Sequence, residues 1–195
     1  YIPVRAKKIE EALEFAEEMG ITGFSVTIPH KESILPDLPE VSAVVGEIGA
    51  CNTAVKQDGV WKGYNTDAPG LQKALCDFLN VKNLAHKKVT IIGAGGAARA
   101  AAYVVKQLRG KCCIFNRTVA KAKALADLFG FKYAALDEAH VGLIEQYSDL
   151  IIQTTSIGMG VPAGTIQDDE KQVDPIPFYN FHGTECVYDI IYNPE

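Results

Sequence analysis

The stretch KKVTIIGAGGAARAAAYVV, residues 87–105, constrains the fold of this chain more than any other part of the sequence. An uninterrupted apolar strand runs into a glycine-rich turn, which opens an alanine-rich helix. Gly93, Gly95 and Ala98 match the pattern G-x-G-x-x-G/A, in which glycines let the backbone approach a pyrophosphate at a helix N-terminus. Glycine turns are common, so the pattern alone is weak evidence. Its position between a buried strand and a helix makes it specific, and we expect a dinucleotide-binding turn here.

The rest of the second half alternates strands with helices. Strands are predicted at 111–118, 149–159 and 186–191, and a helix at 121–129, while the region 160–181, rich in proline, glycine and acids, is expected on the surface. This alternation predicts parallel strands joined by right-handed crossovers, in a Rossmann-like doubly wound sheet. The polar stretch 80–88 is the expected domain boundary, which gives domains 1–83 and 84–195.

The first half also has an α/β pattern, with a helix expected at 8–19, a strand at 23–28 and a helix at 70–79. Asp58-Gly59 favours a two-residue hairpin turn between strands, because glycine tolerates a positive φ. Pairing outward from that turn places Thr53 opposite Tyr64 and Asn52 opposite Asn65. Asp67 follows just beyond the open end, so we expect Asn52 and Asp67 to be neighbours.

Lys31 raises a different question. Pro29 is well suited to open a helix, which would place Lys31 in the first turn. A cation there faces the positive end of the helix dipole, at a cost of roughly a few tenths of a kcal/mol. One interpretation is an exposed lysine whose charge Glu32 offsets; the other is a lysine placed for chemistry. Asp67 has the same ambiguity, because it or Thr66 could simply cap a helix.

The second predicted strand of the Rossmann-like half ends in a way that distinguishes NADP from NAD. An NAD site carries an acidic residue about 20 residues after the glycine turn, where it binds the ribose 2′-hydroxyl. This chain has Asn116, Arg117 and Thr118 instead, with Lys121 close by. Cations would attract a 2′-phosphate, which favours NADP. The alternative is that these cations only begin a solvated helix. A nicotinamide cofactor implies hydride transfer and a group that handles the proton.

Composition excludes several other classes. A formal net charge of -5 gives no overall attraction to nucleic acid or to an anionic membrane surface. The five cysteines have no zinc-binding spacing, so no metal site is expected, and they indicate reduced thiols. No apolar run approaches the length of about 20 residues that a membrane-spanning helix needs. The expected partner is a small-molecule substrate.

Seven motifs follow one another along the chain, namely SVTIPHK, GACNTAV, GYNTDAPG, GAGGAARA, NRT with Lys121, TTSIGM and YDIIYNP. In this order they resemble the shikimate dehydrogenase family from near the first residue to near the last. The resemblance implies two α/β domains that flank a cleft. It also implies NADP-dependent reduction of 3-dehydroshikimate to shikimate.

The resemblance assigns roles to individual residues. It implies that Lys31 is the catalytic lysine with Asp67 as its partner, and that the substrate is contacted by Thr27, Asn52 and Tyr192. The residues that it implies on the cofactor are Gly93, Ala94, Gly95, Gly96, Ala97, Ala98, Asn116, Arg117, Thr118, Lys121, Thr154, Thr155 and Met159.

Some features depart from the family pattern or stay open. The family's first strand with its Ser-x-Ser substrate clamp has no counterpart before Tyr1, and its C-terminal glycine-leucine segment and glutamine-bearing helix have none after Glu195, so we expect a truncated sequence. Ser25 stands where many members have asparagine. Some relatives are fused to a dehydratase or other pathway enzymes.

The alternative functions are a quinate/shikimate dehydrogenase that uses NAD(P) and a regulatory relative that binds a nucleotide but has impaired catalysis. A cytoplasmic location is expected, with a plastid left open.

Overall fold

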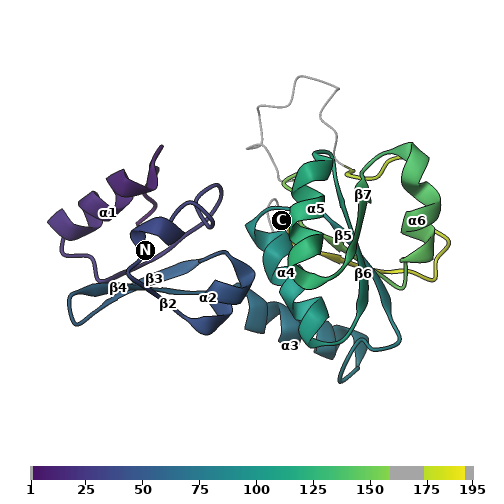
Figure 1. The fold of residues 1–195 in the computed structure, drawn as a ribbon, viewed down its shortest axis with the longest axis horizontal. Helices are drawn as coiled ribbons and strands as arrows, with labels where there is room; N and C mark the ends of the chain where they lie inside the picture. The colour runs from purple at the N-terminus through teal and green to yellow at the C-terminus, as the bar shows by residue number, and fades with distance from the viewer. Residues whose placement is uncertain (1, 159–173, 192–195) are drawn as a thin grey trace. The chain divides into compact units, whose positions relative to one another are not determined.

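The computed structural model describes residues 2–158 and 174–191. The chain forms two compact units, Tyr1–Lys73 and Ala74–Glu195 (Figure 1). The division falls inside helix α3 (Asp67–Leu79), and the predicted boundary at 83/84 lies in the polar stretch after that helix. Each unit combines strands with helices, which confirms the α/β fold class. The cleft between the two domains stays a prediction.

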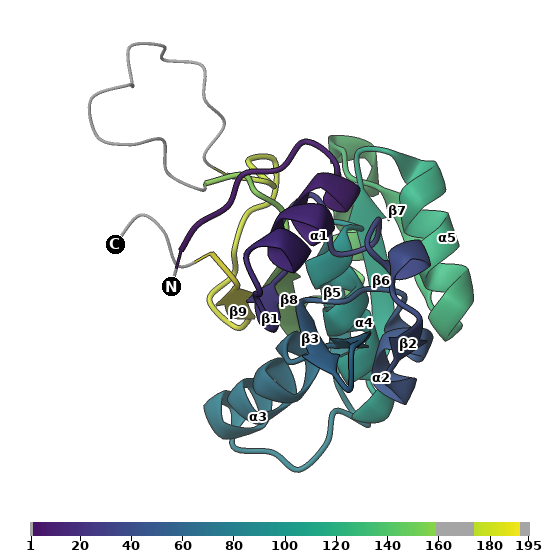
Figure 2. The same ribbon diagram turned by 90° about the vertical axis from the view of Figure 1, so that its left-hand side faces the viewer.

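The first unit is built on a four-stranded sheet with the order β1-β3-β4-β2. Its elements are α1 (Ile9–Glu18), β1 (Gly23–Ser25), a 3-10 turn (Leu35–Asp37), β2 (Glu40–Val41), α2 (Ala43–Ile48), β3 (Thr53–Gln57) and β4 (Val60–Tyr64), which Figure 2 shows from the side of this unit. The predicted helix at 8–19 is confirmed, whereas α2 was not predicted. Ile9 and Ala16 of α1 pack into the same core as Ala54 and Trp61 of the sheet.

The β3–β4 hairpin has the predicted register. Gln57 pairs with Val60 and Thr53 with Tyr64, across a turn in which Asp58 and Gly59 have φ values of 51° and 80°. The ladder ends at the Thr53–Tyr64 pair, so the predicted pairing of Asn52 with Asn65 is wrong. The Asn52 N–H donates to the Tyr64 carbonyl instead, at 3.1 Å, because the chain leaves the sheet there to enter α3.

No α-helix begins at Pro29, so that prediction is also wrong. Residues 28–34 form successive turns that lead into the 3-10 turn, and the predicted strand at 23–28 is shortened to β1. The reason lies a few residues further on. Pro36 lacks an N–H and its ring would clash with the carbonyl of Glu32, and proline also disfavours the α conformation at Leu35. Too few residues remain between Pro29 and Leu35 for a stable helix.

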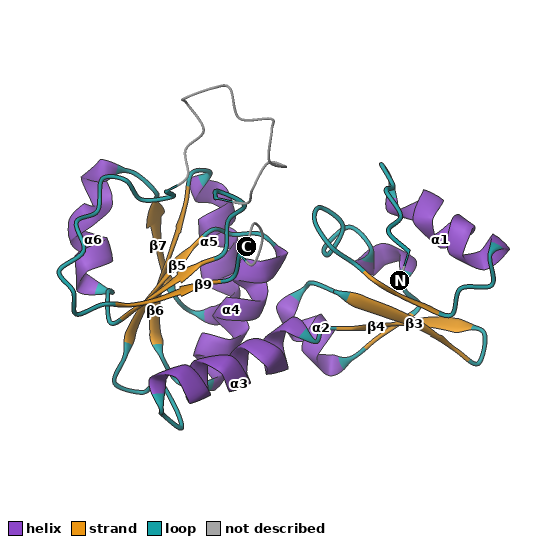
Figure 3. Cartoon of the chain, turned by 180° about the vertical axis from the view of Figure 1, so that it is seen from behind, coloured by secondary structure: helices purple, strands orange, loops and turns teal. Residues whose placement is uncertain are grey.

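The second unit is a five-stranded parallel sheet with the order β7-β6-β5-β8-β9. Its strands are β5 (Lys88–Ile92), β6 (Lys111–Asn116), β7 (Lys132–Ala135), β8 (Leu150–Gln153) and β9 (Cys186–Asp189), and its helices after α3 are α4 (Gly96–Gln107), α5 (Val119–Phe129) and α6 (Val141–Gln146). In Figure 3, α4 and α5 lie on one face of the sheet and α6 on the other. This arrangement confirms the doubly wound sheet. The sequence did not predict β7 or α6.

The segment before β9 is only partly on the surface. The predicted surface excursion spans 160–181, and its residues up to 173 lie outside the described part of the chain. From residue 174 onward it enters the core, where Ile176 and Tyr179 are 2% and 4% exposed and pack with Phe115 and Ile144. The prediction of a surface segment is therefore wrong here, because these side chains cover the α6 face of the sheet.

Candidate active site and cofactor site

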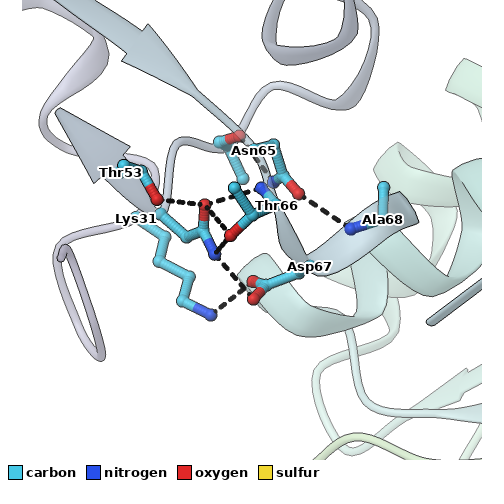
Figure 4. Close-up of polar contacts among 8 residues, drawn as sticks. Lys31, Thr53, Asn65, Thr66, Asp67 and Ala68 are labelled. Atoms are coloured by element: carbon cyan, nitrogen blue, oxygen red, sulfur yellow. Dashed lines mark hydrogen bonds and ion pairs between the residues drawn. The ribbon is translucent and has the colours of Figure 1, made fainter. Parts of the chain in front are cut away.

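Lys31 and Asp67 form an ion pair within the first unit. The Lys31 Nζ lies 2.7 Å from the Asp67 Oδ2, and the two side chains are 18% and 34% exposed (Figure 4). Lys31 reaches Asp67 from the turns after β1, and its carbonyl accepts the Cys51 N–H at 2.7 Å. The interpretation of Lys31 as a solvated lysine offset by Glu32 therefore does not describe this geometry.

The amide of Asn52 holds the other oxygen of the same carboxylate. Its Nδ2 donates to the Asp67 Oδ1 at 2.7 Å and to the Thr66 Oγ1 at 2.9 Å. Its Oδ1 accepts the Thr66 N–H at 2.8 Å and the Thr53 hydroxyl at 3.0 Å (Figure 4). The predicted proximity of Asn52 and Asp67 is confirmed.

Asp67 begins α3 but is not its side-chain cap. That position belongs to Asn65, whose Oδ1 accepts the Ala68 N–H at 3.0 Å while its Nδ2 donates to the Ala50 carbonyl at 2.9 Å. Asn65 is 7% exposed. Asparagine is a good capping residue, so the sequence contained this signal, although only Thr66 and Asp67 were considered for the role. Because Asn65 caps the helix, the Asp67 carboxylate is able to bond Lys31 and Asn52 instead.

Thr27 lies beside this group. The N–H of the preceding residue, Val26, donates to the Asn52 carbonyl at 2.8 Å, and the Thr27 carbonyl accepts the His30 N–H at 2.8 Å. The Thr27 residue is exposed. Tyr192, the third residue predicted to contact the substrate, lies outside the described residues.

This arrangement can exchange a proton with an oxygen atom. An ammonium group has three N–H donors, and Asp67 occupies one of those on Lys31. The other two can point at a hydroxyl or carbonyl oxygen of a bound molecule. The carboxylate accepts a hydrogen bond from the lysine and so orients it, and both groups are only partly exposed to water. Such a pair is suited to general acid–base chemistry.

The predicted cofactor residues meet at one edge of the second sheet. Because β5, β6 and β8 are parallel, their carboxyl ends lie together, and they lead into Gly93, Arg117 and Thr154 respectively. In parallel sheets, ligands bind at this edge, where the strand order reverses. Here the reversal falls between β5 and β8.

Gly93 could not be replaced by a larger residue without rearrangement. Its φ is 112°, a value that L side chains rarely adopt, and a Cβ atom there would lie 2.5 Å from the Thr154 Oγ1. The Thr154 hydroxyl in turn donates to the Ile92 carbonyl at 2.6 Å. The glycine turn and the end of β8 are therefore packed closely together.

The N-terminus of α4 has the properties of an anion site. Gly95 is its N-cap and makes no side-chain hydrogen bond, and the first turn contains no acidic residue. A Cβ at Gly95 would meet nothing within 4 Å, so a ligand could approach the backbone there. Ala98 is fully buried against the sheet side of the helix. These features fit a phosphate held by backbone N–H groups.

The end of β6 presents cations to solvent. The Asn116 Nδ2 donates to the Thr118 carbonyl at 3.0 Å, which closes the loop before α5. The Arg117 and Lys121 side chains are exposed, and in the described part of the chain neither makes a hydrogen bond or an ion pair. No carboxylate occupies the position that would bind a ribose 2′-hydroxyl.

Gln153 is a site residue that the sequence analysis missed. It is 4% exposed at the end of β8. Its Nε2 donates to the Thr155 Oγ1 at 2.9 Å and to the Ile157 carbonyl at 3.1 Å, while its Oε1 accepts the Thr155 N–H at 3.0 Å. Gln153 thus shapes the loop that carries the predicted cofactor residues Thr154 and Thr155. Met159 lies outside the described residues.

Other kinds of site receive no support within residues 2–158 and 174–191. No group of three or more His, Cys, Asp or Glu side chains is arranged to hold a metal ion. No helix described there is long and apolar enough to cross a bilayer. All five cysteines are free thiols.

Two family models match the chain. Residues 1–54 match the model described as "Shikimate dehydrogenase substrate binding domain", and residues 78–171 match "Shikimate / quinate 5-dehydrogenase". A curated protein named shikimate dehydrogenase (NADP(+)), from Shouchella clausii, is 38% identical over 98% of this chain and 67% of its own length.

Solved structures give the same result. A shikimate dehydrogenase in complex with NADP+ is 34% identical, with a TM-score of 0.77 over 99% of this chain and 66% of that protein. The enzyme from Thermus thermophilus, solved with NADP(H) and shikimate, is 28% identical, with a TM-score of 0.74 over 98% of this chain and 66% of that protein. The chain thus spans about two thirds of the length of the relatives it matches.

Proposed function

Because the chain belongs to the shikimate dehydrogenase family, we propose that it catalyses the reversible, NADP-dependent reduction of 3-dehydroshikimate to shikimate. It is then an oxidoreductase that acts on a CH–OH group. The observation that best supports this proposal is the contact of 2.7 Å between Lys31 and Asp67, because it provides a group for the proton that accompanies hydride transfer.

Lys31 and Asp67 divide the handling of that proton. Reduction of the ketone adds a hydride to the carbonyl carbon, and the oxygen takes a proton from the Lys31 ammonium group. In the reverse direction the neutral amine accepts the hydroxyl proton while the hydride leaves the carbon. Asp67 accepts a hydrogen bond from the Lys31 Nζ and so orients the amine.

The second unit contributes the residues that would hold NADP. When bound, the nicotinamide supplies or accepts the hydride. The glycine turn at residues 93–98 and the N-terminus of α4 would hold the pyrophosphate, and Arg117 and Lys121 would pair with the 2′-phosphate. The hydrogen bond from Asn116 to the Thr118 carbonyl shapes the loop between β6 and α5. Thr154 and Thr155 follow strand β8.

We assign three residues to substrate binding, namely Thr27, Asn52 and Tyr192. The structure describes Thr27 and Asn52. Both lie beside the Lys31–Asp67 pair on the first unit. A ring with several hydroxyl groups needs side chains that donate and accept hydrogen bonds, which the Thr27 hydroxyl can do directly. Asn52 would contact the substrate by exchanging one of its bonds to Thr66 or Thr53 for a bond to a substrate hydroxyl. A quinate substrate and NAD remain the competing combination, since the matching family model covers both activities. The missing carboxylate after β6 favours NADP.

The proposal extends to the location of the protein and to its partner. Free cysteines are typical of proteins in a reducing compartment, which supports a cytoplasmic location. A small-molecule substrate is the proposed partner.

The test is the Lys31→Ala variant, in the protein with its natural termini. We expect kcat for shikimate oxidation to fall by about a hundredfold or more, because proton transfer of this kind contributes about that much. NADP binding and the unfolding midpoint should stay close to wild type. Lys62→Ala is the matched control, because Lys62 is an ion-paired lysine of the same unit, 3.0 Å from Glu40. A near-normal kcat for Lys31→Ala would refute the role of Lys31.

A further inference from the structure

We propose that Thr66 is a positioning residue for this reaction, which acts through Asn52 to hold the Asp67 carboxylate against Lys31. The inference rests on the proposed function of the Lys31–Asp67 pair. Thr66 lies next to Asp67 in the sequence and bonds both ends of the Asn52 amide. Its N–H donates to the Asn52 Oδ1, and its hydroxyl accepts from the Nδ2 at 2.9 Å and also lies 3.3 Å from the Oδ1.

The orientation of the Asn52 amide follows from its partners. A backbone N–H can only donate, so the atom that receives the Thr66 N–H at 2.8 Å is the oxygen. An ionised carboxylate can only accept, so the atom 2.7 Å from the Asp67 Oδ1 is the nitrogen. The two partners agree, and Thr66 therefore helps to fix which end of the amide faces Asp67.

The hydroxyl of Thr66 completes this arrangement. One N–H of Asn52 goes to Asp67 and the other to the Thr66 Oγ1, at 2.9 Å, while the Oδ1 accepts from Thr66 and Thr53. An amide has two donors and two acceptor sites, so the Asn52 side chain is fully hydrogen-bonded. Rotation about its terminal bond would break several of these bonds at once. Asp67 is consequently held by Asn52 at Oδ1 and by Lys31 at Oδ2.

The Thr66 hydroxyl has no evident role in the stability of the fold. Thr66 is exposed, and the N-terminus of α3 is capped by the Asn65 side chain. Removal of the hydroxyl should therefore disturb the Asn52 amide much more than the helix. This separates a positioning role from a structural one.

The experiment compares Thr66→Val with Thr66→Ser in the protein with its natural termini. We expect Thr66→Val to lower kcat by about fivefold to tenfold, which corresponds to the loss of roughly one hydrogen bond. The KM for NADP and the unfolding midpoint should stay unchanged, and Thr66→Ser should restore kcat because it keeps the hydroxyl. Thr22→Val is the matched control, since Thr22 is an exposed threonine of the same unit whose side chain makes no hydrogen bond in the described residues.

A double-mutant cycle with Asn52→Ala distinguishes action through Asn52 from any other route. If Thr66 acts through Asn52, Thr66→Val should have no further effect on kcat in the Asn52→Ala background. Independent, additive losses would overturn the inference.

A crystal structure of Thr66→Val tests the same point without activity. The backbone N–H of Thr66 stays in this variant, so we expect the Asn52 amide to keep its orientation while its Nδ2, without the Thr66 Oγ1, shifts relative to the Asp67 Oδ1. An amide and a carboxylate in unchanged positions would overturn the inference. A wild-type protein that does not oxidise shikimate would overturn the proposed function alone.

Discussion

At the scale of single residues, Arg117 is the side chain that we propose for the 2′-phosphate of NADP. It follows the last residue of β6 and is exposed, so its guanidinium can form charge-assisted hydrogen bonds with a 2′-phosphate. We expect Arg117→Ala to raise the KM for NADP by about tenfold or more while kcat stays within a few-fold, because Arg117 binds a part of the cofactor that does not react. Steady-state kinetics with both cofactors check this.

Lys111→Ala provides the comparison for Arg117→Ala. Lys111 is an exposed cation at the opposite end of β6, so its removal changes net charge equally without touching the cofactor edge. It should leave the KM for NADP near wild type. Equal losses with NAD and NADP in Arg117→Ala would contradict the assignment of the 2′-phosphate.

The residues of the candidate site differ in how far the sequence could reveal them. Asn52 and Asp67 were predicted to be neighbours because the two-residue turn fixes the register as far as the Thr53–Tyr64 pair, and both residues lie just beyond the open end of the hairpin. The roles of Thr66 and Gln153 were not predicted, because both depend on side-chain hydrogen bonds. Threonine and glutamine are common polar residues, and no sequence pattern indicates which of them make such bonds. The Lys31–Asp67 contact joins segments 36 residues apart, and only the resemblance to a family suggested it.

At the scale of elements, the loop after β8 depends on one buried side chain. Gln153 bonds Thr155 and Ile157, so its replacement by leucine leaves buried polar groups without partners. We expect Gln153→Leu to lower the free energy of unfolding by about 1–3 kcal/mol and to weaken NADP binding, because the loop loses its defined shape. Urea unfolding and NADP titration measure the two effects.

Gln146→Leu is the matched control for Gln153→Leu. Gln146 is exposed at the end of α6, so the same substitution there should change the free energy of unfolding by less than about 0.5 kcal/mol. If Gln153→Leu bound NADP as tightly as wild type, the loop would not depend on this residue for its shape.

Elements with a strong local pattern were predicted well, and those defined by tertiary contacts were not. The helix at α1 and the strands β5 and β6 have clear apolar patterns and were found near their observed bounds, whereas the strand predicted at 149–159 ends at Gln153 in β8. The turns at 28–34 were mistaken for a helix because Pro29 favours a helix start, whereas Pro36 leaves no room for one. The segment at 174–181 was judged by its composition, although the strands and helix α6 provide a surface for it to cover.

At the scale of the whole molecule, each unit contains a carboxylate whose pKa is lowered in the folded state. In the first unit, hydrogen bonds from Lys56 and then Trp61 lower the pKa of Glu17 from its ordinary value of 4.5. In the second, the backbone N–H of His182, followed by the Tyr179 hydroxyl, lowers the pKa of Glu185 to about 2. Glu17 links α1 to the hairpin, and Glu185 holds the segment that precedes β9.

Acid should therefore destabilise both units. A carboxylate with a lower pKa in the folded than in the unfolded state stabilises the fold above pH 4.5, and this contribution disappears as the pH falls through the folded value. For Glu185 that window extends from pH 4.5 down to about 2. We expect the thermal midpoint to fall with pH across this window, and Glu185→Gln to lower it at pH 7 while weakening its dependence on acid. Glu17→Gln should act in the same direction.

Glu138→Gln is the control for these two variants, because Glu138 is an exposed glutamate in the 3-10 turn before α6. It should leave the pH dependence as it is in the wild type. Calorimetric scans at pH 7, pH 4.5 and about pH 2.5 test all three variants, since they cover the upper part of the range over which Glu185 takes up its proton. A Glu185→Gln variant with the same midpoint as wild type at pH 7 would show that the bonds to His182 and Tyr179 add nothing to stability.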